Sequence, residues 1–232
     1  GGALVIHDGE DRRLLMRARE IPATLGGLAD FNIANSLAAI AIAHAHGVRA
    51  STIRGAMASF SSSFQQSPGR LNVFDGHGFR VIMDYAHNPA SMTALCELVA
   101  KLRPDHDRVI GMISIPGDRR DEDIRTMGEI AAGGFDDLVF RETPDGRGRT
   151  PGEIIALLEE GALAAGFPPE RIHRRRRERD AVEFCLQAAR AGDLVVLTPT
   201  EVEATWPMVT GFRAGRAQRS EAERSFAPSA AS

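Results

Sequence analysis

The order of hydrophobic and polar positions divides the chain into two parts. In the first part, residues 1–18 predict two short strands joined by a turn. Residues 32–45 are nearly free of charge and rich in Ala and Ile, which predicts a helix that ends at Gly47 and is buried on most sides. A second helix with Ser51 as its N-cap follows, and the polar stretch 61–67 after it predicts a domain boundary.

In the second part, strand-like and helix-like segments alternate. The first two strands, within residues 71–84, are expected to form a hairpin because the Asp75-Gly76-His77-Gly78 segment between them has the composition of a tight turn. The later elements are strands at 108–114, 137–141, near 172 and at 193–198, and helices at 89–102, 121–132, from the N-cap Thr150 with Pro151 onward, and at 178–191. Such alternation predicts an α/β fold with a mostly parallel sheet and helices on both faces.

The composition narrows the class of protein. The 232 residues are 43% hydrophobic and 25% charged, as in globular proteins with a core, and the formal net charge is −3. This charge gives no reason to expect nucleic acid or a membrane as a partner, and no long apolar run or signal-peptide pattern occurs. Cys96 and Cys185 lack metal-ligand spacing, which predicts buried, reduced thiols and a cytoplasmic location.

Both ends of the sequence carry a prediction. The chain opens in a strand-like run without an initiator Met, and we interpret it as the C-terminal fragment of a longer protein. Residues 218–232 are rich in Ala, Ser and charge, which predicts a disordered tail.

Three segments follow predicted strands at the edge where open α/β sheets bind ligands: residues 84–89, 114–121 and 198–201. In the first, the Asp84 carboxylate is suited to accept hydrogen bonds from two ribose hydroxyls, and His87 and Asn88 follow at the start of a helix. Composition alone favours a simpler interpretation, in which Asp84 and Asn88 cap that helix and His87 packs.

The second segment is denser in charge. Gly117 allows a ligand to approach the backbone, Asp118 and Asp121 are acceptors, and Arg119 and Arg120 can bind carboxylate or phosphate through two hydrogen bonds. A solvated loop in which Asp121 caps the next helix explains the same residues equally well.

Other charged positions are less informative alone. Arg70 lies at the predicted domain junction, where it could reach phosphates held by the first domain, although a single linker Arg is most often solvated. The basic run 173–180 has no interleaved aromatic residues, so a solvated corner is favoured over a nucleic-acid site. The sequence contains no phosphate loop, no metal-ligand spacing and no nucleophile elbow.

Taken in order, several of these segments resemble the Mur ligase superfamily. Phe31-Asn32-Ile33-Ala34-Asn35 before an Ala-rich helix, Pro68-Gly69-Arg70 and Asp84-Tyr85-Ala86-His87-Asn88-Pro89 match the end of the central ATPase domain and the start of the C-terminal domain. Within that superfamily, the cyanophycin synthetases are most similar, over residues 68–75, 84–91, 116–123, 145–149 and 152–153.

The resemblance implies a domain organisation and a reaction. Residues 1–66 would be the C-terminal part of the central ATPase domain, and residues 67–217 the Rossmann-like Mur ligase C-terminal domain, with an antiparallel hairpin at its start. The parent enzyme would be an ATP-dependent ligase that phosphorylates a carboxylate and lets an amine attack the acyl phosphate. In cyanophycin synthetases, the Mur-like part adds Arg to Asp side chains of a polymer.

The resemblance also implies site residues, cofactors and partners. Asn32 and Asn35 would lie near adenine, and Asp84 would hold the ribose. Arg70 would act on the phosphates as the catalytic residue, while His87 and Asn88 line the same cleft. The substrate would face Gly117, Asp118, Arg119, Arg120 and Asp121. ATP and Mg²⁺ would be the cofactors, with upstream Mur central and ATP-grasp domains, Arg and an Asp-containing polymer as partners, and oligomerisation left open.

Two alternatives remain open. Because the phosphate loop is missing from these residues, the chain alone is expected to be inactive, and it could be a non-catalytic Mur-like module that binds nucleotide or polymer. It could also come from another Mur-type ligase, acting on peptidoglycan precursors or folylpolyglutamate.

Overall fold

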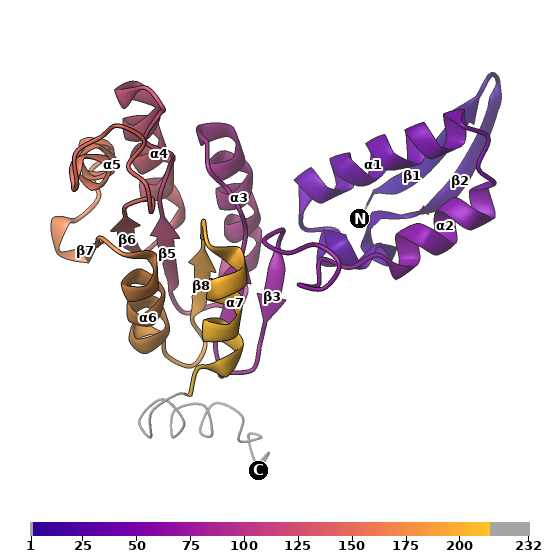
Figure 1. The fold of residues 1–232 in the computed structure, drawn as a ribbon. Helices are drawn as coiled ribbons and strands as arrows, with labels where there is room; N and C mark the ends of the chain where they lie inside the picture. The colour runs from indigo at the N-terminus through magenta and orange to yellow at the C-terminus, as the bar shows by residue number, and fades with distance from the viewer. Residues whose placement is uncertain (1, 214–232) are drawn as a thin grey trace, which may run out of the picture. The chain divides into compact units, whose positions relative to one another are not determined.

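The computed structural model describes residues 2–213, except for the side chain of Asp8, so the predicted tail at 218–232 lies outside the described residues. The chain forms two compact units that divide between Ser67 and Pro68 (Figure 1).

The first unit is a two-stranded sheet packed against two helices. Its elements are β1 (Ala3–Asp8), β2 (Asp11–Arg17), the 3₁₀ turns η1 (Ala18–Glu20) and η2 (Pro22–Thr24), α1 (Asp30–Ala45) and α2 (Ala50–Ser59). The strands pair antiparallel, as predicted from the turn between them. Side chains from both strands and both helices meet in one small core, formed by Leu4, Ile6, Leu15, Met16, Ile21, Ala23, Ile40 and Ile53.

Two details of this unit differ from the sequence-based predictions. Helix α1 was expected to be buried on most sides, but Ser36 and Ile40 are its buried residues, while Leu37 is 45% and Ile42 63% exposed. A two-stranded sheet offers too narrow a surface to cover more than one stripe of a helix. Ser51 does not cap α2, because the helix begins one residue earlier and its N-cap position is Arg49.

The second unit is a six-stranded sheet in the order β3-β4-β8-β5-β6-β7. Its strands are β3 (Asn72–Phe74), β4 (Arg80–Met83), β5 (Val109–Ile113), β6 (Asp137–Arg141), β7 (Ile172–Arg175) and β8 (Leu194–Leu197). The β3–β4 pair is antiparallel and the other four pairings are parallel. The predicted α/β architecture with an antiparallel hairpin at its start is therefore confirmed.

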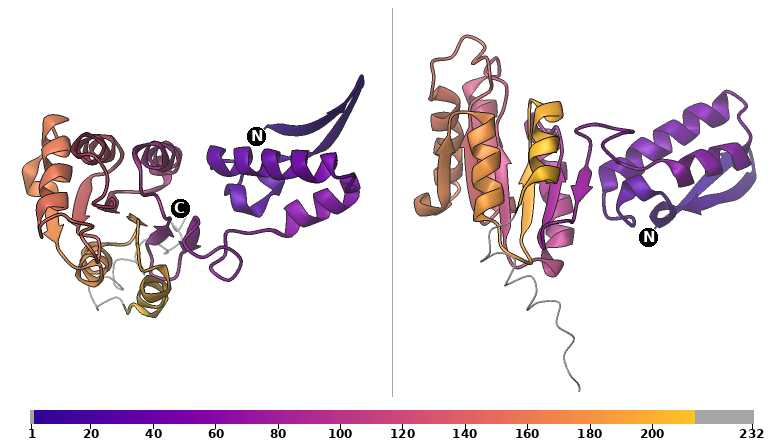
Figure 2. Two further views of the ribbon diagram at one scale, coloured as in Figure 1. Left: turned by 45° about the horizontal axis from the view of Figure 1, so that its top comes forward. Right: turned by 60° about the horizontal axis from the view of Figure 1, so that its bottom comes forward.

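Helices cover both faces of this sheet. The helices α3 (Pro89–Leu102), α4 (Asp121–Gly134) and α5 (Glu153–Ala164) lie on one face, and α6 (Glu178–Ala188) and α7 (Val202–Gly211) on the other (Figure 2). Short 3₁₀ turns occur at η3 (Arg103–Asp105) and η4 (Pro169–Arg171). The central strands β5 and β8 are buried along their whole length, which explains their unbroken apolar sequences. None of the described helices is long and apolar enough to cross a membrane.

Two helices of this unit correct the sequence-based predictions. Helix α5 begins at Glu153 rather than at Pro151, and its N-cap position is Gly152, so Thr150 is not the cap. Instead, the Glu153 carboxylate accepts hydrogen bonds from the backbone N–H and the hydroxyl of Thr150. Helix α7 was not predicted, because Pro207 stands inside it and disfavours a helix by sequence alone.

Candidate functional site

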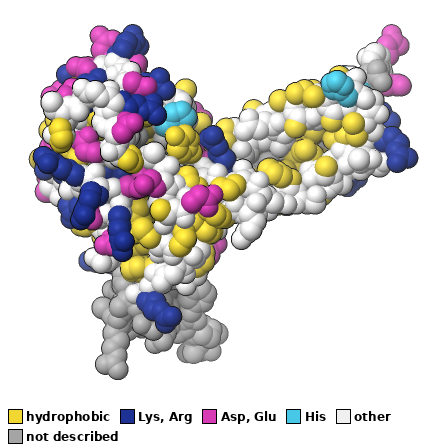
Figure 3. All heavy atoms as spheres, in the orientation of Figure 1, with side chains coloured by type: hydrophobic (Ala, Val, Ile, Leu, Met, Phe, Trp, Pro, Cys, Tyr) yellow, Lys and Arg dark blue, Asp and Glu magenta, His cyan; other side chains and the backbone are white. Residues whose placement is uncertain are grey.

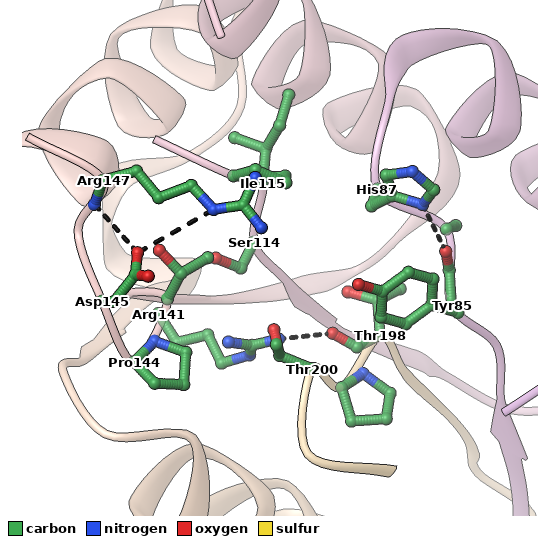
Figure 4. A pocket seen from close by; sticks show the side chains of 14 residues that line it. Tyr85, His87, Ser114, Ile115, Arg141, Pro144, Asp145, Arg147, Thr198 and Thr200 are labelled. Carbon is green, nitrogen blue, oxygen red and sulfur yellow. Dashed lines mark hydrogen bonds and ion pairs between the residues drawn. The ribbon is translucent and has the colours of Figure 1, made fainter. Parts of the chain in front are cut away.

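A pocket opens at the carboxyl edge of the six-stranded sheet, where β8 lies between β4 and β5. The segments that follow β4, β5, β6 and β8 line it, and Figure 4 shows their side chains around a common space. The lining residues are Tyr85, Ala86, His87, Ser114, Ile115, Pro116, Arg141, Thr143, Pro144, Asp145, Arg147, Thr198, Pro199 and Thr200. This is the edge at which parallel α/β sheets bind ligands.

The floor of the pocket contains a buried charge. Arg141, the last residue of β6, is 1% exposed and forms an ion pair with Glu178 at the start of α6, with 3.0 Å between Nη1 and Oε2. Burial lowers the pKa of the Arg141 guanidinium, and the Glu178 carboxylate opposes that shift.

Three polar atoms of the pocket lining are buried without a hydrogen-bond partner among the described residues: Ser114 Oγ, Arg141 Nε and Thr143 Oγ1. Unpaired buried polar atoms are uncommon and costly. Their concentration in one pocket indicates a site that receives polar groups from outside the protein chain.

Next to the pocket, hydrogen bonds connect the Pro68-Gly69-Arg70 turn and the residue after it to the end of β4. The Gly69 carbonyl accepts a hydrogen bond from Tyr85 N–H (2.8 Å), and Leu71 N–H donates to Asp84 Oδ2 (3.0 Å). Gly69 has φ +70°, and a Cβ there would lie 2.8 Å from Val202, so both its conformation and its surroundings favour glycine.

This connection brings Arg70 beside the predicted ribose-binding residue. The Arg70 guanidinium lies 5.4 Å from the centre of the Tyr85 ring. Burial raises the pKa of the Asp84 carboxyl, while the hydrogen bond from Leu71 and the charges of Arg70 and His87 oppose that rise. Arg70, Asp84 and His87 thus form one cluster, although they come from separate segments of the sequence.

His87 and Asn88 have defined local roles. His87 Nδ1 lies 2.8 Å from the Tyr85 carbonyl, which can only accept a hydrogen bond, so Nδ1 carries the proton and Nε2 is the acceptor in the neutral ring. The Asn88 side chain accepts a hydrogen bond from Ser91 N–H (2.9 Å) and caps α3. For Asn88, the capping interpretation is therefore confirmed.

The charged loop at 117–121 is bound to the loop at 145–149. Arg147 donates to Asp118, and Arg149 donates to Asp121 and to the carbonyls of Gly117 and Arg119. A Cβ at Gly117 would collide with the carbonyl of Gly146. The sequence predicted that a ligand approaches the backbone at Gly117, and in the structure the loop 145–149 lies in close contact with it.

The other charged residues of that loop differ in their partners. Arg120 binds Asp123 within α4, at 3.0 and 2.9 Å. Asp121 is the first residue of α4 rather than its N-cap, which is Arg120. Arg119 is exposed, and no ion pair with a described residue engages its guanidinium. Of this segment, Arg119 has the side chain most available to a ligand.

Asn32 and Asn35 lie on α1 of the first unit. The Asn32 side chain donates to the Ala23 carbonyl (2.6 Å), which joins the helix to η2, and Asn35 Nδ2 lies 3.4 Å from Asn32 Oδ1. Asn35 is exposed and Asn32 is half-buried.

The basic run at 173–180 is largely neutralised by neighbours. Arg174 pairs with Glu159, Arg177 with Asp180, and Arg175 stacks on the Phe184 ring at 4.2 Å. These contacts support the interpretation as a solvated corner, with the exception of the buried Glu178. Among residues 2–213, no group of three or more His, Cys, Asp or Glu is arranged to hold a metal ion.

The sequence did not identify the buried polar residues in and beneath the pocket. Ser114 was within a segment identified as ligand-facing, but Arg141, Thr143 and Glu178 were not singled out. The available signal was a charged residue, Arg141, directly after the apolar stretch Leu138-Val139-Phe140.

Known proteins similar to this chain include ligases. The model of the family described as Mur ligase, glutamate ligase domain, matches residues 69–200. Cyanophycin synthetase from Geminocystis herdmanii is 38% identical over 211 residues, which are 91% of this chain and 24% of that protein. The UDP-N-acetylmuramoyl-L-alanyl-D-glutamate--2,6-diaminopimelate ligase of Geobacter metallireducens is 32% identical over 203 residues, 82% of this chain and 38% of that protein. The chain spans about a quarter of the cyanophycin synthetases that it matches.

Solved structures show the same fold. FolC of E. coli, in complex with ADP and without folate substrate, has a TM-score of 0.58 and 26% identity, over 80% of this chain and 40% of FolC. The UDP-N-acetylmuramoylalanyl-D-glutamyl-2,6-diaminopimelate--D-alanyl-D-alanyl ligase of Acinetobacter baumannii has a TM-score of 0.59 and 19% identity, over 90% of this chain and 41% of that protein. The second similarity, at its low identity, concerns the fold alone.

Proposed function

The chain belongs to the Mur ligase family, and on that premise we propose that it supplies substrate-binding groups to an ATP-dependent ligase that joins a carboxylate to an amine. The observation that carries the proposal is the connection of the Pro68-Gly69-Arg70 turn to the end of β4. It gathers Arg70, Asp84 and His87 beside a pocket whose floor holds unpaired polar atoms. A cation, an acceptor and a polar cavity are the groups that a nucleotide and a small polar substrate require.

The nucleotide would be bound by the cluster next to the pocket. The Asp84 carboxylate has acceptor capacity beyond its bond to Leu71 N–H and is suited to the two ribose hydroxyls. Arg70 is exposed and carries a fixed positive charge, so it is suited to offset charge on the phosphates. Asn32 and Asn35 are the proposed adenine contacts from the first unit.

The proposed reaction passes through an acyl phosphate. Transfer of the γ-phosphoryl group of ATP to a carboxylate gives ADP and the acyl phosphate, and attack by an amine then forms the amide and releases phosphate. Water competes with the amine for the acyl phosphate. A binding surface that orders the amine and excludes water therefore speeds the productive step.

The amine substrate would bind across the pocket and its rim. Arginine, the amino acid that the cyanophycin synthetase likeness suggests, carries both a carboxylate and a guanidinium. Asp145 and Arg147 line the pocket, and Arg147 binds Asp118, the neighbour of Arg119 in the loop 117–121. The Arg119 guanidinium is suited to the carboxylate of the substrate, and the Asp145 carboxylate to its guanidinium. An Asp-containing polymer would supply the acceptor carboxylate.

The remaining parts of the site would come from outside these residues. We propose that residues 1–66 complete a central ATPase domain whose phosphate loop precedes them, and that residues 67–217 are the closing C-terminal domain. Mg²⁺ would be held mainly by that upstream part and would neutralise phosphate charge when bound. The upstream part of the parent protein, including an ATP-grasp domain, is the proposed intramolecular partner.

The test is a comparison of amine substrates in the full-length protein. We expect ATP-dependent amide formation on a short poly-aspartate primer with arginine, and none with diaminopimelate or glutamate. Incorporation of diaminopimelate into a UDP-muramoyl peptide in place of arginine would contradict the substrate assignment and retain the ligase. Absence of ADP formation with every pair would contradict the ligase itself.

Titration of the isolated chain with ATP separates the ligase from a self-sufficient binding module. Half of a divided nucleotide site is expected to bind ATP very weakly, since the phosphate contacts of a phosphate loop are missing. A submicromolar dissociation constant would favour the binding module.

A further inference from the structure

Glu178 is a buried carboxylate to which the proposed reaction assigns no part. It is the first residue of α6 and is 5% exposed, on the sheet face covered by α6 and α7. It lies under the segment 198–201, which connects β8 to α7 and lines one wall of the pocket with Thr198, Pro199 and Thr200.

Three hydrogen-bond donors and one ion-pair partner surround this carboxylate. Glu178 Oε2 accepts from Thr200 N–H (2.8 Å) and contacts Arg141 Nη1 (3.0 Å). Its other oxygen, Oε1, accepts from Glu201 N–H and from the Thr205 hydroxyl, both at 3.0 Å. Three hydrogen bonds and one ion-pair contact therefore engage both oxygens of the Glu178 carboxylate.

Arg141 extends the same contacts to the strand end. Its Nη1 donates to the Glu142 carbonyl (2.9 Å), and its Nη2 donates to the Thr198 carbonyl (2.7 Å) and the Thr200 hydroxyl (3.0 Å). The pair thus joins the ends of β6 and β8 to the starts of α6 and α7. Within segment 198–201, Thr198, Thr200 and Glu201 are each bound by Glu178 or Arg141.

A buried ion pair is a poor way to gain stability. The cost of removing two charges from water offsets most of their attraction, and well-packed apolar residues often serve a fold better. The benefit in this place is geometric, because a carboxylate with three hydrogen bonds and an ion-pair contact holds segment 198–201 in one position.

We propose that Glu178, acting through Arg141 and segment 198–201, is a positioning residue that holds the wall of the pocket in the conformation that receives the amine substrate. The inference rests on the proposed function for the identity of that substrate. Glu178 itself touches neither substrate nor reacting atoms.

The same contacts argue against Arg141 as a receptor for a substrate anion. Its charge is already balanced by Glu178, and its two terminal nitrogens are engaged by the protein, so Nε is the nitrogen left without a partner. Arg119, which is exposed and has no ion pair with a described residue, is better suited to bind an anion.

The first test measures hydrogen exchange in the full-length protein without ligands. Glu178→Gln replaces one oxygen by an NH₂ group, which cannot accept, so either Thr200 N–H or Glu201 N–H loses its acceptor and the ion pair with Arg141 is lost, which loosens the whole segment 198–201. We expect the amides of Thr200 and Glu201 to exchange about ten- to a hundredfold faster, while amides of β5 keep their protection. Glu183→Gln, in an exposed pair with Arg179 on the same helix, is the matched control and should change neither region.

A milder variant covers the case in which Glu178→Gln does not fold. Thr205→Val keeps the side-chain shape and removes the hydroxyl that donates to Glu178 Oε1. Glu201 N–H keeps its acceptor, but the carboxylate is less constrained. Its expected effect on the Thr200 and Glu201 amides is smaller, about three- to tenfold. Unchanged exchange at both amides in a folded variant, whether Thr205→Val or Glu178→Gln, would overturn the positioning role.

The second test separates positioning from general loss of structure. In ligation assays, Glu178→Gln should raise KM for the amine substrate about tenfold while KM for ATP changes less than about twofold. Equal changes in both constants would contradict the proposal. If the wild-type protein performs no ligation but Glu178→Gln still speeds exchange at 198–201, the positioning role stands and the proposed function is refuted. The failure of one proposal is therefore distinguishable from the failure of the other.

Discussion

The carboxyl and amino edges of the six-stranded sheet both gather charged residues, but they use them differently. At the carboxyl edge, the pocket contains buried polar atoms of Ser114, Arg141 and Thr143 without partners among the described residues. At the amino edge, a polar recess contains ion pairs: Arg108 binds Asp193 at 2.6 Å and lies 3.5 Å from Asp137. Near the amino edge, His106 Nε2 is also buried without a partner among the described residues, but it stands alone there. The three unpaired atoms that share one pocket indicate that the carboxyl edge is arranged to receive a ligand, whereas the ion pairs of the amino edge stabilise the fold.

A second contrast separates the two units. Hydrophobic side chains are visible along the helices of the first unit, whereas charged side chains crowd the surface of the second (Figure 3). Leu37 and Ile42 of α1 are among the exposed hydrophobic residues, while the core of the second unit includes fully buried residues from the strands β4, β5, β6 and β8. The second unit therefore has an extensive core of its own, whereas helix α1 of the first unit presents apolar side chains on its surface.

The largest expected effect is at the carboxyl edge. Arg70→Ala and Asp84→Ala in the full-length protein should each lower kcat/KM for ATP-dependent ligation by about a hundredfold or more, because each removes a charge or acceptor for the nucleotide. Their unfolding transitions should remain cooperative. Full ligation by both variants would refute the site assignment.

A stability effect of similar size is expected at the amino edge. Asp193→Ala removes the acceptor of Arg108 and of Arg190 N–H, and should lower the free energy of unfolding by about 2–4 kcal/mol. Denaturant titration measures this change. Ligation at a temperature where the variant is folded should be retained, and its loss there would weaken the contrast between the edges. Arg179→Ala, which breaks an exposed pair, is the control and should change stability by less than about 1 kcal/mol.

A smaller kinetic effect is expected from separating the loops 117–121 and 145–149. A side chain at Gly117 would collide with Gly146, so Gly117→Ala should separate the loops and raise KM for the amine substrate by about tenfold. Gly133→Ala meets open space on α4 and should leave both kinetics and folding intact. Equal kinetics in the two variants would exclude a role for the loop contact in substrate binding.

The smallest expected effect concerns the pH dependence of stability. The pKa of Asp84 is raised in the folded protein, so folding favours its protonated form, and the unfolding free energy should fall as pH rises through that pKa. Asp84→Asn removes this fall and should slightly raise the melting temperature at neutral pH, with no difference in acid. Ligation should still be impaired. A variant less stable than wild type at neutral pH would contradict the raised pKa.

Much of the second unit was predictable because local pattern and tertiary role agree. The bounds of α3 and β6 match the predicted ranges, since a Pro at the first helical position and an apolar strand are strong local signals. Helix α7 and the exposed face of α1 were not predicted. The first contains a proline, and the second depends on which elements lie nearby rather than on its own sequence.

The site was predictable only in part. Asp84, His87 and Arg70 were identified from motifs, and the structure adds the hydrogen bonds that bring their segments together. Glu178 was hidden in a run of charges that is otherwise solvated, since nothing in the sequence distinguishes one buried carboxylate from its exposed neighbours. Pairing between residues 37 positions apart, such as Arg141 and Glu178, is a property of the fold.

The most direct test of the contrast between the two edges is hydrogen exchange of the full-length protein with and without MgATP and arginine. The account predicts slower exchange at 85–88, 114–117 and 198–201 when both are bound, and unchanged exchange at 106–108 and 190–193. Protection confined to the amino edge, with none at the carboxyl edge, would contradict it.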